Sequence, residues 1–75
     1  MESQREEAER QAEEIIQKAR DAMKLEKKRV LEEARDEIAS LVVMTSAKVL
    51  GRELSSEERS RFSEAAAREA KNALN

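Results

Sequence analysis

The chain has 75 residues, of which 43% are charged, and its net charge is −2. A chain this short forms at most one small domain, and the near balance of acidic and basic residues gives no electrostatic case for a nucleic-acid partner. With neither cysteine nor histidine, the sequence provides no disulfide framework and no Cys/His metal site, and it lacks the commonest general base. We therefore predict no catalytic residue, no cofactor, no metal and no small-molecule ligand.

The composition predicts helix rather than a self-contained core. Alanine makes up much of the 39% of residues that are apolar, and Phe62 is the only aromatic residue. Chains rich in Ala, Glu, Lys, Leu and Arg are typical of long helices and coiled coils. Disorder is the alternative, because large apolar residues are scarce, but the periodicity of those present argues against it. No apolar run approaches the ~20 residues that span a bilayer, and the N-terminus does not resemble a signal peptide.

Residues 2–50 contain neither proline nor glycine and predict one long helix. A seven-residue repeat fails, because the heptad series that start from Ile15 and from Ala12 both run into charged residues. An eleven-residue repeat succeeds, and this period of 3.67 residues per turn predicts a right-handed coiled coil. We predict that two such helices form a dimer. The seam of that dimer consists of Ala8, Ala12, Ile16, Ala19, Met23, Val30, Ala34, Ile38 and Leu41, and the same series continue to Thr45 and Val49, with Lys27 as the polar exception.

Charged residues occupy the other faces of this helix and pair along it, for example Glu6 with Arg10. At 1.5 Å per residue the helix would form a rod about 70 Å long. The densest basic patch, Lys24 with residues 27–29, is interleaved with no aromatic side chain and is flanked by acids, so we favour a solvated face of the rod over a nucleic-acid or membrane-surface site.

The segment "LVVMTSAKVL", residues 41–50, carries a second apolar stripe. Val43, Ala47, Leu50 and Leu54 follow the spacing i, i+4, i+7, i+11. A helix with two apolar stripes has two neighbours. The second neighbour is either the chain itself, as a wider dimer core or a folded-back segment, or another subunit. The β-branched residues also leave a strand as a minor alternative.

Gly51 is the only glycine in the chain and follows this apolar segment directly. It fits the position just past a helix end, where a left-handed backbone conformation closes the last turn. Ser55 and Glu58 then provide a capping box for a second helix over about residues 56–73. Phe62, Ala66, Ala70 and Ala73 would line one face of that helix, with Ala65 and Leu74 at its edge. Because an interior glycine costs a helix only ~1 kcal/mol, a kinked but continuous helix is the alternative.

The segment "ARDEIASLVVMTSAKVLGRELSSEERSRF", residues 34–62, resembles the cytoplasmic part of subunit b of F-type ATP synthases, the peripheral stalk or stator subunit. That family shows an eleven-residue periodicity, then a pattern like Ala-Glu-x-Ile-x-x-Leu, a small-residue segment, and often Gly-Arg-Glu-Leu before an acidic turn and a final helix. The corresponding residues are 34–41, 48–54 and 55–58, and "AEEIIQKAR" at residues 12–20 matches the repetitive middle of the family.

The resemblance implies a non-catalytic structural subunit, all-α, in which a long helix dimerises as a right-handed coiled coil and a short C-terminal helix follows. Residues 1–40 would be the charged stalk and dimerisation helix, and residues 41–75 would bind the delta subunit on the catalytic head. The implied delta-binding residues are Val43, Ala47, Leu50, Leu54, Phe62, Ala66 and Ala70, and the helix junction is Gly51, Ser55 and Glu58.

The resemblance also implies a place and a set of partners. The partner in the dimer would be a second copy or a related b-type chain. The complex would act in ATP synthesis and hydrogen ion transport, at the cytoplasmic face of the cell membrane or the equivalent face of another energy-transducing membrane. Family members begin with a membrane helix that joins them to the membrane sector, so we expect these residues to be a soluble portion of a longer protein. The alternatives are a peripheral stalk of an archaeal or vacuolar-type rotary ATPase and a generic coiled-coil adaptor.

Overall fold

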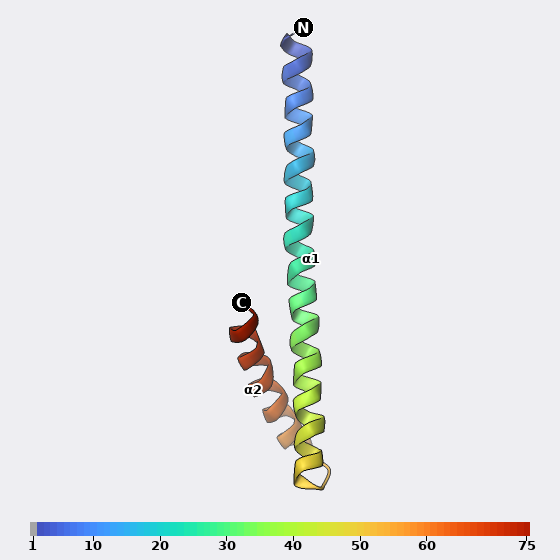
Figure 1. The fold of residues 1–75 in the computed structure, drawn as a ribbon, viewed down its shortest axis with the longest axis vertical. Helices are drawn as coiled ribbons and strands as arrows, with labels where there is room; N and C mark the ends of the chain where they lie inside the picture. The colour runs from blue at the N-terminus through green and yellow to red at the C-terminus, as the bar shows by residue number, and fades with distance from the viewer. Residues whose placement is uncertain (1) are drawn as a thin grey trace.

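The computed structural model describes residues 2–75 and contains two helices, α1 (Glu2–Leu50) and α2 (Ser56–Leu74), with no strand in this range. Helix α2 folds back beside the C-terminal part of α1, and the rest of α1 extends alone (Figure 1). The molecule measures 75 × 17 × 16 Å, with a radius of gyration of 21.9 Å. A compact chain of this length would have a radius near ~11 Å, so the shape is that of a rod.

These elements confirm the all-α prediction, with a long helix followed by a short one. The strand alternative for residues 41–50 and the kinked continuous helix are both wrong, since α1 is helical to Leu50 and ends there. The coiled-coil dimer and its eleven-residue repeat stay predictions.

Local interactions alone support the extended part of α1. Every residue from 2 to 30 is exposed. Arg29 joins two turns of this helix, with Nη2 2.6 Å from Glu26 and Nη1 2.8 Å from Glu33. Arg10 pairs with Glu7, three residues before it, and not with Glu6 as predicted. The hydrogen bond from Arg29 lowers the pKa of Glu26. Such pairs favour the helical state without any tertiary contact.

Gly51 ends α1 in the left-handed conformation, at φ 68°. Its amide donates to the carbonyls of Ala47 and Lys48 at 2.9 and 3.2 Å, and the amide of Arg52 donates to the carbonyl of Ala47 at 3.3 Å. This is the Schellman pattern, which satisfies carbonyls that the helix end would otherwise leave without donors. The predicted helix cap at Gly51 is confirmed.

The predicted capping box at the start of α2 is also confirmed. Ser55 is extended, and its Oγ accepts from the Glu58 amide at 3.1 Å while Glu58 Oε1 accepts from the Ser55 amide at 3.0 Å. Hydrogen bonds thus cap the end of α1 and the start of α2, and only five residues connect the two helices. These caps fix the course of the connection, so that α2 runs back along α1.

The contact between the helices uses small side chains. Among residues 2–75, only Ala39, Leu54 and Ala70 are buried. Half-buried residues surround them: Leu31, Ala34, Arg35, Val43, Ser46 and Ala47 on α1, and Glu58, Phe62, Ser63, Ala66 and Ala67 on α2. Alanine and serine let two helix backbones approach closely but bury little area each. Helix α2 thus lies beside α1 as far back as Leu31, on both sides of the predicted division at residue 40.

The cap at Gly51 can be tested by Gly51→Ala. A Cβ there meets no atom within 4 Å, so the only penalty is the left-handed backbone conformation. We expect the free energy of unfolding to fall by about 1–2 kcal/mol, measured by urea denaturation followed by circular dichroism. Gly51→Asn should cost less, because asparagine adopts this conformation more readily. A more stable Gly51→Ala variant would show that α1 continues through residue 51 in solution.

Candidate functional site: an apolar groove between the two helices

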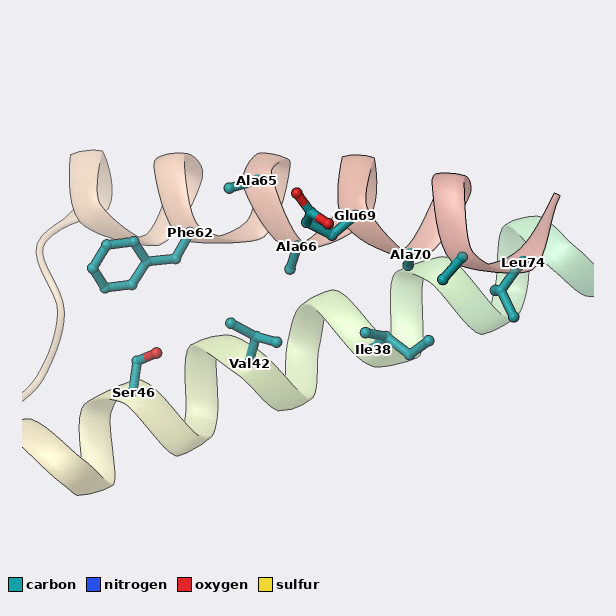
Figure 2. Close-up of a pocket in the computed structure, with 10 residues that line it drawn as sticks. Ile38, Val42, Ser46, Phe62, Ala65, Ala66, Glu69, Ala70 and Leu74 are labelled. Carbon is teal, nitrogen blue, oxygen red and sulfur yellow. The ribbon is translucent and has the colours of Figure 1, made fainter.

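An open groove runs along the hairpin, between α1 and α2. It consists of two adjoining hollows of about 620 and 510 Å³ that share Val42, Ser46 and Phe62. Figure 2 shows the first hollow, with Ile38 and Val42 of α1 below Ala66 and Leu74 of α2. The α1 wall is completed by Leu41, Thr45, Val49 and Leu50, and the α2 wall by Ala65, Glu69, Ala70 and Ala73.

The chemistry of the groove is hydrophobic. Its polar members are two hydroxyl side chains, Thr45 and Ser46, and the carboxylate of Glu69. Several large side chains remain exposed along it, among them Leu41 at 60% and Val49 at 81%. Within residues 2–75 there is also no group of three or more side chains suited to hold a metal ion. What this surface can do is bury the apolar face of another molecule.

The predicted dimer seam lies open on α1. Of its nine residues, eight are exposed and Ala34 is half-buried by α2. Met23 and Val30 keep 64% and 47% of their surface exposed. Helix α2 therefore leaves the seam free. At its C-terminal end the seam meets the groove, because Ile38 and Leu41 belong to both.

The predicted partner-binding residues divide between two surfaces. Leu50, Phe62, Ala66 and Ala70 line the groove. The other three, Val43, Ala47 and Leu54, line a separate hollow with Ser40, Met44, Glu53, Arg59 and Ser63. Within the chain itself, Val43 and Ala47 are half-buried and Leu54 is buried. The second apolar stripe therefore has the folded-back helix as one neighbour.

Part of the groove was not predicted from the sequence. Val42 lies at its centre and was assigned to no site, and Leu74 at its end was predicted only at the edge of the apolar face of α2. The pattern that could have identified the α1 wall is a third stripe, Ile38, Val42, Thr45 and Val49, which repeats the spacing i, i+4, i+7, i+11. The α2 wall is mostly alanine, and alanine gives little contrast in a periodicity analysis.

An ion pair locks the turn that holds the two walls together. Arg52 donates from both terminal nitrogens to Glu58, at 2.9 and 2.8 Å, and from Nη1 to the carbonyl of Glu53 at 3.1 Å. The hydrogen bond from Arg52, followed by that from the Ser55 amide, lowers the pKa of Glu58 to about 2. Glu58 thus caps the N-terminus of α2 and, through Arg52, also holds the end of α1. Sequence analysis found the capping role but missed Arg52.

The basic patch of α1 lies at the opposite end of the hairpin. Side chains from both helices surround a hollow of about 430 Å³ there, namely Lys24, Lys27, Lys28, Leu31, Glu32, Arg35, Lys71 and Asn75. The hollow is at the C-terminus of α2, where the helix dipole favours nearby cations. Lys24, Lys27 and Lys28 are themselves exposed.

Comparison of the chain with protein-family models, with curated proteins and with solved structures gave no match. Neither helix in the described part of the chain is apolar over a stretch long enough to cross a bilayer.

The ion pair at the turn makes the stability of the hairpin depend on acid pH. The folded pKa of Glu58, about 2, is below the ordinary value of 4.5, so its contribution is complete above pH 4.5 and is lost as the pH falls toward 2. We expect the difference in urea midpoint between the unmodified chain and Glu58→Gln to shrink across this range.

Glu57→Gln is the matched control, because this neighbouring exposed side chain does not pair with Arg52. It should leave the acid dependence of the midpoint unchanged. Equal pH profiles for the unmodified chain and Glu58→Gln would show that the Arg52–Glu58 pair does not hold the turn in solution.

Proposed function

We propose that this chain is the head-proximal part of a peripheral stalk, subunit b of an F-type ATP synthase, acting as a non-catalytic stator. The observation that carries the proposal is the placement of the distinctive segment "KVLGREL". It spans the end of α1, the left-handed Gly51 and the buried Leu54, so the part of the sequence that resembles the family is also the part that forms the chain reversal.

The mechanics of α1 suit such a role. A stator subunit holds a catalytic head against the torque of a rotor, which requires a long element that resists bending and twisting. Helix α1 is continuous over 49 residues, and the molecule is 75 Å long and about 17 Å wide. A single helix bends easily at that length, and a second helix wound around it would stiffen it.

The open seam supports a second copy, or a related chain, as that second helix. Apolar residues recur along α1 with the eleven-residue period, and eight of the nine seam residues are exposed. Alanines in the N-terminal half allow close approach, and larger residues in the C-terminal half supply more buried area per contact. In a right-handed pair these residues would face each other along the whole rod.

The hairpin supports the attachment to the head. It adds a second apolar surface at one end of the rod, whereas the apolar side chains within residues 2–30 lie among mainly charged ones. In the proposed complex the delta subunit binds this end. The hollow around Val43, Met44, Ala47 and Leu54 is the candidate contact, because Met44 remains 59% exposed there beside predicted partner-binding residues.

The dimer is tested by Leu41→Glu, which places a carboxylate in the seam of each copy. Loss of two buried leucines, at ~2 kcal/mol each, predicts a dimer dissociation constant raised by at least about 100-fold in sedimentation equilibrium. Leu25→Glu is the matched control, because Leu25 is a similarly exposed leucine (69%) outside the seam. A chain that stays monomeric at high concentration, or equal effects of the two variants, would contradict the proposed dimer.

The attachment to the head is tested by titrating the chain with the delta subunit of an F-type ATP synthase from the same organism in a calorimeter. We expect saturable binding that Met44→Glu weakens by at least about tenfold, since a charge would have to be buried in the contact. Leu25→Glu, which lies outside the hollow around Met44, should bind as the unmodified chain does. Absence of binding by a chain that does dimerise would refute this part of the proposal.

A further inference from the structure

The groove and the seam belong to one continuous surface. The last members of the three eleven-residue series, Leu41, Thr45 and Val49, all line the α1 wall of the groove, together with Ile38. A helix that follows the seam from Ala8 onward would therefore arrive at the groove. This continuity depends both on the eleven-residue period of the sequence and on the position of α2 beside α1.

The drift of the seam around α1 explains why it reaches the groove. Eleven residues of a helix with 3.6 residues per turn make slightly more than three turns, so the seam moves around the helix by about 20° with each repeat. At Ala8 and Ala19 the seam lies on a part of α1 that α2 does not accompany. By Ile38 and Val49 the seam has moved to the flank of the face that α2 covers, where α2 forms the second wall of the groove. Figure 2 shows this wall opposite Ile38.

The hairpin is incomplete without a further layer. It buries only three side chains, two of which are alanines. Ile38, Val42, Leu50 and Leu74 each keep at least 37% of their surface exposed along the groove. Such a contact is small for holding a helix of 19 residues in place, because short helices depend on tertiary packing. A helix laid in the groove would cover these side chains and the α2 wall at the same time.

We propose that helix α1 of a second copy occupies this groove, in parallel orientation. A parallel copy brings its own residues 38–49 to the groove, so apolar residues meet apolar residues. An antiparallel copy that overlaps the whole length of α1 would instead present residues 2–14, which contain Ala8, Ala12 and ten charged or amide side chains. Burying those charges without partners would be unfavourable. The occupant is thus a second copy in the parallel arrangement.

Each α2 then acts as a clamp on both long helices. A two-fold axis along the rod places the two α1 helices side by side and the two α2 helices on opposite flanks. Every α2 contacts its own α1 through Ala70 and the partner α1 through the groove wall of Phe62, Ala65 and Ala73. This inference rests on the dimer of the proposed function and adds to it a four-helix bundle at one end of the stalk.

The absence of natural cysteine allows a direct test with single-cysteine variants. A chain of residues 1–75 carrying Ala65→Cys on the α2 wall is mixed with the same chain made longer by a tag and carrying Thr45→Cys on the α1 wall. The two are unfolded and refolded together. We expect oxidation to give a cross-linked heterodimer of intermediate size. Glu64→Cys is the matched control, since it lies next to Ala65 on α2 but outside the groove, and with Thr45→Cys it should give no such product.

Three results would overturn the inference, and they differ from one another. In the first result, the chain is a dimer in sedimentation and cross-links through Leu41→Cys, but no cross-link forms between Ala65→Cys and Thr45→Cys. This would support the stator dimer and contradict the contact between α2 and the partner α1. A chain that remains monomeric would remove both. A dimer in which Ala65→Cys reacts freely with a maleimide until the delta subunit is added would assign the groove to the head instead of the second copy.

Discussion

The left-handed backbone of Gly51 is the constraint on which the rest of this structure depends. With φ at 68°, the chain leaves the axis of α1 at a defined point and with a defined direction. Arg52 and Ser55 then fix the course of the next four residues by hydrogen bonds to Glu58, and α2 starts antiparallel to α1. Had residue 51 been helical, α2 would continue the rod, Ala39 would be exposed, and no groove would exist.

The two parts of the chain are stable for different reasons. In residues 2–30, helix formation rests on local propensity and on ion pairs between exposed side chains, such as Arg29 with Glu26 and Glu33. Each pair is weak, and salt screens it. In the hairpin, the helices also support each other through apolar contact. A change of ionic strength therefore acts mainly on the extended part of α1, and a change in the capping residues acts mainly on the hairpin.

Most of the fold could be predicted because its signals are local. The absence of Gly and Pro before residue 51, the single Gly51, and the Ser55–Glu58 spacing each act within one or two helical turns, and each predicted what the structure shows. The site could be predicted only in part, because it is tertiary. Whether Val43 and Phe62 contact each other's helix or another protein depends on the direction of the chain after Gly51, and periodicity carries no information on that direction.

The distribution of large side chains places the strength of the proposed dimer at the hairpin. The seam positions between residues 8 and 22 are Ala8, Ala12, Ile16 and Ala19, and three of these four side chains are small. The groove end has the larger side chains Ile38, Leu41, Val42 and Val49. Association energy scales with apolar area, so the alanine-rich half holds two helices close but weakly, and the hairpin end holds them firmly. Two helices joined in this way are fixed to each other near the proposed head and can separate or slide most easily at the far end. Such a stalk would take up elastic twist along its charged length without loosening the end that grips the head.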